Sequence, residues 1–182
     1  MTISSWIFLN STVLPATEIP SAGFTCIASS SLSDEHSCEN VYRRENGKEG
    51  WVTDSAREGS WIKIEFHQLI RISKIVYRHN EHKYDYKCCN RNFKDLSLHF
   101  SDGSIGNMTV DDVFERDTNV DFLYRIYPPK ISSHLLLKVN AVYDHYEAAS
   151  VSNHNRESYA QNRFGISSIR VYGKIEAGKV MQ

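Results

Sequence analysis

The stretch that most constrains the fold runs from residue 61 to residue 77 and reads WIKIEFHQLIRISKIVY. Its first half alternates, with Ile62, Ile64 and Phe66 on one face and charged or polar residues between them. A period of two indicates a β-strand with one buried face. A second β-forming run follows residues 67–71, so the stretch is predicted to form an antiparallel hairpin. Because an isolated hairpin is not stable in water, further strands must cover it.

Comparable runs recur along the chain, and no convincing amphipathic helix is present. Asp102-Gly103 stands between two apolar runs and is a strong hairpin-turn signal. Pro128-Pro129 is expected to end the strand before it. The further predicted strands cover residues 24–28, 93–100, 105–113, 122–126, 135–143 and 165–173. About eight strands of this length indicate an all-β, antiparallel β-sandwich.

The two ends of the chain lack this periodicity. Residues 1–23 are predicted to form an extended N-terminal arm, in which the apolar run Trp6-Ile7-Phe8-Leu9 is a candidate anchor on a partner. Residues 24–174 are predicted to form the folded domain, and residues 175–182 a short polar tail.

The charge balance limits the kinds of partner that the chain is expected to bind, and the cysteine content indicates its cellular compartment. The 21 basic and 22 acidic residues give a net charge of −1, which argues against nucleic-acid binding driven by a basic field. No apolar run is long enough for a transmembrane helix, so no membrane partner is expected. The four cysteines include an adjacent pair and make a poor disulfide framework, and no secretory signal is visible at the N-terminus. An intracellular location is therefore expected.

The connections between the predicted strands differ in length in a regular way. If successive strands run antiparallel, their connections alternate between the two ends of the sandwich. The tight connections at 67–71, 101–104 and 128–133 then share one end. The long polar connections share the other end, where binding residues usually lie: 31–60, 80–92, 114–120 and 144–164.

Aromatic and arginine side chains are numerous in the long connections. Tyr, Trp and Arg are enriched at interface hot spots because they bury area and keep a polar group. For Trp51 the alternative is that it fills the end of the core. The predicted partner-binding residues are Tyr42, Arg43, Arg44, Trp51, Asn80, Tyr84, Tyr86, Tyr146, Arg156, Tyr159 and Arg163.

Neither catalytic nor metal-binding motifs stand out. No G-x-S-x-G elbow or phosphate-binding glycine loop occurs, so no catalytic residue is predicted. His79, His82, Cys88 and Cys89 have metal-ligand side chains, but adjacent cysteines seldom bind one ion together, so no metal site is predicted.

Six short motifs follow one another in an order typical of one family. They are Ser29-Ser30-Ser31, Trp51-x-Thr53, Trp61-Ile-x-Ile64-x-Phe66, Ile72-x-x-Ile75, Phe100-Ser-Asp-Gly-Ser104 and Gly165-Ile-x-x-Ile169-x-Val171-Tyr-Gly173. In this order the chain resembles the discoidin domain, also called the coagulation factor V/VIII C-type domain, of the galactose-binding-like superfamily. The resemblance implies an eight-stranded antiparallel jelly-roll β-sandwich that binds ligands through loops at one end. It also leaves calcium open as a cofactor, with oxygen atoms from the region of Glu35, His36, Asp54 and Glu81.

Two features separate the chain from the secreted members of that family. No cysteine follows Cys89 to tie the ends of the domain, and the loop tips are polar. The chain is therefore expected to be most similar to the small intracellular members, which are protein-interaction modules. The first hypothesis is a non-enzymatic module that docks into a larger assembly in the cytoplasm, cilium or cytoskeleton through the loop end and the arm. The alternative is a discoidin-type lectin that binds a small glycan.

Overall fold

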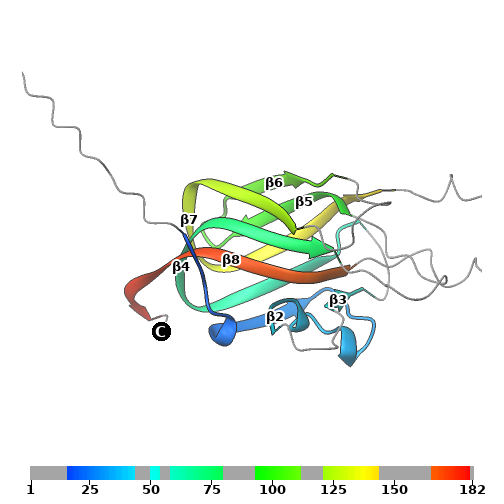
Figure 1. The fold of residues 1–182 in the computed structure, drawn as a ribbon, viewed down its shortest axis with the longest axis horizontal. Coiled ribbons are helices and arrows are strands. Elements are labelled where there is room, and N and C mark those ends of the chain that lie inside the picture. The colour runs from blue at the N-terminus through cyan, green and yellow to red at the C-terminus, as the bar shows by residue number, and fades with distance from the viewer. Residues whose placement is uncertain are drawn as a thin grey trace, which may run out of the picture.

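Two long, bent strands form the centre of the computed structural model: β4 (Trp61–His79) and β7 (Asp121–Val142). They pair antiparallel along almost their whole length, from Trp61 opposite Lys138 to Arg78 opposite Asp121. Each strand bends near its middle, where the register shifts, and Figure 1 shows both bends at the same end. The two legs of each strand therefore lie in different layers of a sandwich. The structure describes residues 16–43, 50–53, 58–79, 93–111, 121–143 and 165–180.

The other strands extend the two layers on either side of these legs. The first layer is completed by β2 (Phe24–Ala28), β5 (Phe93–Phe100) and β6 (Ile105–Thr109). The second layer is completed by β8 (Gly165–Val180), whose outer edge carries β1 (Thr17–Glu18) and β3 (Trp51–Val52). Three short helical segments connect them: η1 (Ser21–Gly23), η2 (Asp34–His36) and α1 (Asn40–Arg43). The prediction of an eight-stranded antiparallel sandwich is confirmed.

The core consists of the alternating residues that the sequence singled out. Ile62, Ile64 and Phe66 of β4 are buried; Ile62 lies opposite Leu137 and Ile64 opposite Leu135 in the ladder with β7, and both leucines are buried too. Burying one such side chain stabilises the fold by about 1.5–3 kcal/mol before the loss of entropy is subtracted. No helix in the described part of the chain is long and apolar enough to cross a membrane.

The predicted hairpin at residues 61–77 is wrong. The two runs form one strand, and neither pairs with the other, because β7 pairs with both legs of β4. Residues 67–71 stay in the strand, with Gln68 opposite Val180 and Ile70 opposite Ser132, so the chain bends there without leaving the sheet. The bend still reverses the direction of the chain, as a hairpin turn would.

Pro128-Pro129 does not end a strand either. β7 continues through both prolines, with a cis peptide bond between Tyr127 and Pro128. The ladder with β4 has no partners for residues 126–129, between Arg125 and Lys130. Proline is tolerated at such an irregularity because no ladder hydrogen bond needs its missing N–H.

The folded region extends beyond the predicted boundaries at residues 24 and 174. β1 pairs with Tyr172 and Gly173, and the backbone N–H of Ile19 donates to the Val171 carbonyl at 2.8 Å. β8 continues past Gly173, with Ile175 opposite Ile70. Residues 1–15, including the apolar run at 6–9, lie outside the described residues.

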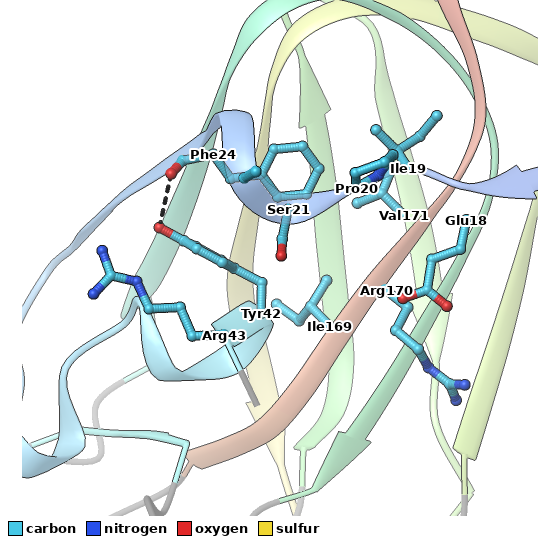
Figure 2. A pocket seen from close by; sticks show the side chains of 11 residues that line it. Glu18, Ile19, Pro20, Ser21, Phe24, Tyr42, Arg43, Ile169, Arg170 and Val171 are labelled. Carbon is cyan, nitrogen blue, oxygen red and sulfur yellow. Dashed lines mark hydrogen bonds between the residues drawn. The ribbon is translucent and has the colours of Figure 1, made fainter. Parts of the chain in front are cut away.

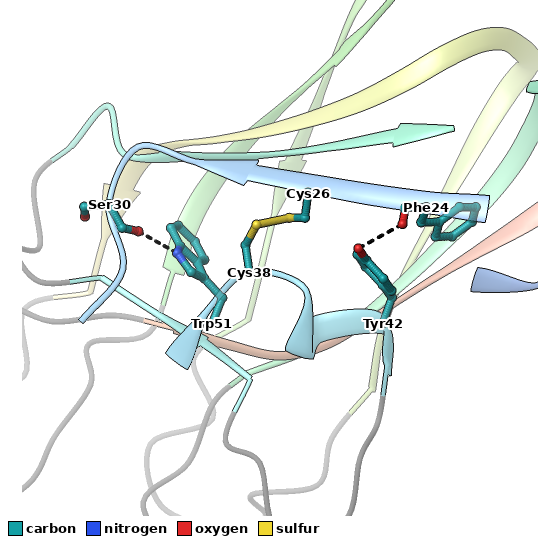
Figure 3. Close-up of a disulfide and its surroundings, with 6 residues drawn as sticks. All are labelled: Phe24, Cys26, Ser30, Cys38, Tyr42 and Trp51. Atoms are coloured by element: carbon teal, nitrogen blue, oxygen red, sulfur yellow. Dashed lines mark hydrogen bonds between the residues drawn. A yellow bond between two sulfur atoms is a disulfide. The ribbon is translucent and has the colours of Figure 1, made fainter. Parts of the chain in front are cut away.

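A disulfide joins Cys26 and Cys38, contrary to the expectation from the cysteine spacing (Figure 3). Cys26 lies on β2 and Cys38 just before α1, and their Cα atoms are 5.8 Å apart. Tertiary packing brings these two cysteines together, and the spacing of four cysteines in the sequence does not reveal it. Cys88 and Cys89 lie outside the described residues.

A buried hydroxyl holds the bend of β7 to the turn after β5. The Oγ atom of Ser132, which has no exposed surface, accepts from the Ser101 N–H at 2.8 Å and donates to the His134 carbonyl at 2.5 Å. Ser132→Ala leaves that N–H without its partner, and we expect the free energy of unfolding to fall by about 1–3 kcal/mol. Urea unfolding measures it. Ser133→Ala is the matched control and should change stability by less than about 0.5 kcal/mol.

Candidate functional site

The ends of five strands converge at one end of the sandwich, which we call the loop end. Val52 pairs with Gly165, Arg78 with Asp121, and Phe93 with Val142. The long connections predicted at 80–92, 114–120 and 144–164 therefore all begin and end here. The bends of β4 and β7 lie at the opposite end, together with the turn at Ser101–Ser104 (Figure 1). The prediction that the long connections share one end of the sandwich and the tight connections the other is confirmed for the described strand ends that these connections join.

Aromatic side chains pack against one another beneath the loop end. The ring of Tyr77 stacks on Phe122, with centroids 5.2 Å apart, and lies 6.3 Å from Phe93. Burial raises the pKa of the Tyr77 hydroxyl well above its usual range, and the nearby Tyr143 adds to the shift. The hydroxyl therefore stays neutral at physiological pH.

Residues 29–36, between β2 and the end of η2, form a polar segment at the loop end, which we call the 29–36 rim. Hydrogen bonds to its backbone fix it: Leu32 N–H donates to the Val52 carbonyl at 2.8 Å, and Asn40 Nδ2 donates to the Glu35 carbonyl at 2.6 Å. The Ser33 hydroxyl is 2.8 Å from His36 Nδ1. The side chains of Ser31, Ser33, Asp34 and Glu35 are exposed to solvent. The rim thus offers hydroxyl and carboxylate groups on a fixed backbone.

The structure describes three of the predicted partner-binding residues. Trp51 is fully buried, and its Nε1 donates to the Ser30 carbonyl at 2.8 Å, so its side chain fills the end of the core (Figure 3). Tyr42 is also buried, and its hydroxyl donates to the Phe24 carbonyl at 3.1 Å. Arg43 is exposed. The other predicted residues lie outside the described residues: Arg44, Asn80, Tyr84, Tyr86, Tyr146, Arg156, Tyr159 and Arg163.

The 29–36 rim was missing from the predicted site. Its signal in the sequence is a run of small polar and acidic residues, SSSLSDEH, directly after a strand. Hydroxyl and carboxylate side chains rank low among protein-interface hot spots, so a prediction from aromatic and arginine side chains does not include this run.

The calcium ligands that the resemblance left open are only partly described. Glu35 and His36 belong to the rim, whereas Asp54 and Glu81 lie outside the described residues. In the part of the chain that the structure covers, no three His, Cys, Asp or Glu side chains are grouped as metal ligands.

A carboxylate between two guanidinium groups ties three strands together near the loop end. Arg78 on β4 contacts Asp121 Oδ1 at 2.8 Å, and Arg170 on β8 contacts Oδ2. Burial alone would raise the pKa of Asp121, but the hydrogen bonds from Arg78 and Arg170 outweigh it and lower this pKa. Asp121 therefore carries its charge throughout the physiological range.

This ion pair predicts a pH-dependent difference between the wild type and Asp121→Asn. A carboxyl group with a lowered folded-state pKa stabilises the fold above its unfolded pKa of about 4, and this contribution is lost as the pH falls through the folded value. We expect the wild type to be more stable at pH 7 and the difference to shrink below about pH 4. Urea unfolding between these pH values measures it. The exposed Asp111, which makes no ion pair with described residues, provides the control Asp111→Asn.

Comparison with known proteins identifies the fold. No protein-family model and no curated protein sequence matches the chain. The family 32 CBM of NanJ from Clostridium perfringens, solved in complex with galactose, superposes with a TM-score of 0.61 at 12% identity, over 86% of this chain and 98% of that one. An F5/8 type C domain from Bacteroides fragilis gives 0.60 at 10% identity, over 88% and 98%.

Discoidin II from Dictyostelium discoideum gives a TM-score of 0.59 at 8% identity, over 90% of this chain and 60% of that one. The chain therefore has the discoidin, or galactose-binding-like, fold. The resemblance inferred from six short motifs is confirmed at the level of the fold.

Proposed function

We propose that the chain is a non-catalytic carbohydrate-binding domain of the discoidin type, which takes a small glycan at its loop end. The observation that carries the proposal is the fold shared with domains that were solved with sugars bound. One is the galactose complex described above. Another is a Clostridium perfringens domain in complex with GalNAc-β-1,3-galactose, which has a TM-score of 0.60 at 12% identity.

The chemistry of the loop end supports this function. A glycan presents many hydroxyl groups, and each one that loses water on binding needs a hydrogen-bond partner. The exposed hydroxyl and carboxylate groups of the 29–36 rim can accept and donate such bonds. Hydrogen bonds with Trp51, Val52 and Asn40 hold the rim in place, which limits the ordering cost of binding.

Matches to whole enzymes support a non-catalytic role. The chain superposes on a mycobacterial arabinofuranosyltransferase but covers 12% of that chain, and it covers 15% of a family 89 glycoside hydrolase. In both enzymes the similarity concerns one small part of a much longer chain.

The two hypotheses from the sequence do not have equal support. The solved structures favour the lectin over the protein-interaction module, for which the described residues offer no separate observation. The Cys26–Cys38 disulfide favours an oxidising compartment over the reducing one expected from the sequence, because disulfides persist mainly in oxidising environments.

Calorimetric titration with galactose and with GalNAc-β-1,3-galactose tests the proposal. We expect binding of at least one of these sugars, and we expect Asp34→Asn with Glu35→Gln to weaken it about tenfold, because charge-assisted hydrogen bonds contribute about 1.5–3 kcal/mol. Asp102→Asn, at the opposite end of the sandwich, is the control. A glycan array without any hit, together with no heat of binding from either sugar at millimolar concentration, would overturn the proposal.

A further inference from the structure

β6 contains the motif Asn107-Met108-Thr109, which has the form Asn-x-Ser/Thr of an N-glycosylation acceptor. Its middle residue is methionine and not the proline that would exclude the reaction. Short motifs of this kind also arise by chance, so the place of the motif in the fold decides whether it can carry a sugar. The acceptor side chain must reach solvent in the folded protein, because the attached glycan is bulky and hydrophilic.

The side chain of Asn107 meets this requirement. Successive side chains of a strand point to opposite faces, so Asn107 and Thr109 lie on the face opposite the buried Met108, and both are exposed. The Thr109 hydroxyl donates to Asp95 Oδ1 at 2.8 Å, whereas the Asn107 side chain makes no hydrogen bond with a described residue. A sugar on the Asn107 amide would therefore replace no contact in the described part of the fold.

The backbone of β6 leaves room for a bulky group as well, because β6 is the last strand of the first layer (Figure 1). The Val110 N–H donates to the Lys94 carbonyl at 2.9 Å, so the even-numbered residues of this segment direct their backbone groups to β5. The backbone groups of Ile105, Asn107 and Thr109 point away from the sheet. They make no hydrogen bond with any residue that the structure describes.

Other outer strands have partners along their edges. β1 and β3 pair with the outer edge of β8. Along β2, the Tyr42 hydroxyl donates to the Phe24 carbonyl at 3.1 Å (Figure 2), and the disulfide holds Cys38 beside Cys26. β6 has no such cover from the described chain, and it contains neither the lysine nor the proline that protect many exposed edges. A hydrophilic group on β6 would keep this edge from pairing with other chains.

The disulfide indicates the compartment in which such a sugar is attached. N-glycans are transferred to chains that enter the secretory route, and this route also provides the oxidising environment in which disulfides form and persist. The Cys26–Cys38 bridge lies on the opposite side of the first layer from β6, so it is an observation independent of the motif.

We propose that Asn107 is an N-glycosylation site and that its glycan covers the open edge of β6. In the transfer, Asn107 Nδ2 forms a bond to the anomeric carbon of an oligosaccharide carried on a lipid diphosphate. The bond from that carbon to the diphosphate oxygen breaks, the amide loses one proton, and the lipid diphosphate leaves. β6 and the 29–36 rim lie at opposite edges of the first layer, so the modification does not depend on glycan binding at the loop end.

Peptide mapping of the protein purified from the cells that naturally make it tests the modification. Trypsin releases residues 95–116 as one peptide in which Asn107 is the only asparagine, so a glycan on this peptide belongs to one site. The other motif of this form, Asn10-Ser11-Thr12, falls in a different tryptic peptide. Peptide N-glycosidase in ¹⁸O-water should convert glycosylated Asn107 to aspartate labelled with ¹⁸O. Recovery of the peptide with unmodified Asn107 alone would overturn the proposal.

Variants of the full chain, secreted from animal cells behind a cleavable signal sequence, test the motif itself. Thr109→Ala and Asn107→Gln should lose the glycan on residues 95–116, whereas Thr109→Ser keeps the motif and should retain it. A wild-type chain secreted without this glycan would also overturn the proposal. Thermal unfolding confirms that the variants are folded.

The role of the glycan at the edge has its own measurement. In sedimentation velocity, Asn107→Gln should self-associate at lower concentration than the glycosylated Thr109→Ser, and equal self-association would overturn the covering of the edge. Asn107→Gln should bind galactose as the wild type does. Loss of galactose binding in every form of the protein would contradict only the proposed function.

Discussion

Replacing Trp51 with alanine should lower the free energy of unfolding by about 3–5 kcal/mol, the range for large aromatic side chains removed from a core. The indole has no exposed surface, and its Nε1 donates to the Ser30 carbonyl at 2.8 Å. The variant therefore loses apolar contacts, leaves a cavity and frees a carbonyl group that anchors the 29–36 rim. Guanidinium unfolding measures the change.

Trp51→Phe separates these contributions. Phenylalanine keeps most of the apolar contacts but cannot donate to Ser30, so we expect a smaller loss, of about 1–2 kcal/mol. A different result would contradict the structural role of Trp51. If Trp51→Ala unfolded like the wild type and yet lost a ligand, Trp51 would be a binding residue, as predicted from its residue type.

The alternation of apolar and polar residues is the part of the fold that the sequence predicts well. Ile62, Ile64 and Phe66 occupy one face of β4 because a strand has a period of two, and this pattern needs no knowledge of the partners. The same pattern does not say which strand lies next to which. The bend of β4 therefore looked like a hairpin turn, although both of its legs pair with β7.

The candidate sites were harder to predict because residue type does not reveal burial. Trp51 and Tyr42 have the side chains of an interface, yet each donates a hydrogen bond to a backbone carbonyl within the fold. The exposure of Asn107 depends on the place of β6 at the edge of the first layer, which arises from the pairing of β5 with β6 and β7. No local pattern in the sequence encodes that pairing.

Removing the disulfide should have the second large effect. The double variant Cys26→Ser, Cys38→Ser opens a loop between residues that are 12 apart, and a loop of about 15 residues is expected to contribute about 3 kcal/mol by restricting the unfolded chain. For a chain of this size, the melting temperature should fall by roughly 6–12 °C. Calorimetry under non-reducing conditions measures it.

Reductant provides the matched control for this prediction. Dithiothreitol should destabilise the wild type to a similar extent and leave the double variant unchanged. Mass spectrometry of the unreduced protein should recover a peptide pair linked through Cys26 and Cys38. If both thiols were instead alkylated in the native protein, the bridge would be absent, and the reducing compartment expected from the sequence would gain support.

The disulfide also links stability to the proposed function, because the 29–36 rim lies between its two cysteines. Cys26 fixes the start of this segment to β2, and Cys38 fixes its end close to α1. Without the bridge the rim has more conformations to lose when it binds a sugar, and each ordered residue costs about 1–2 kcal/mol of backbone entropy. The double variant should therefore bind galactose more weakly than the wild type at a temperature where both are folded. Unchanged affinity would show that the hydrogen bonds from Val52, Asn40 and Trp51 order the rim without the disulfide, or that the rim does not contact the sugar; the affinity of Asp34→Asn with Glu35→Gln distinguishes these two outcomes.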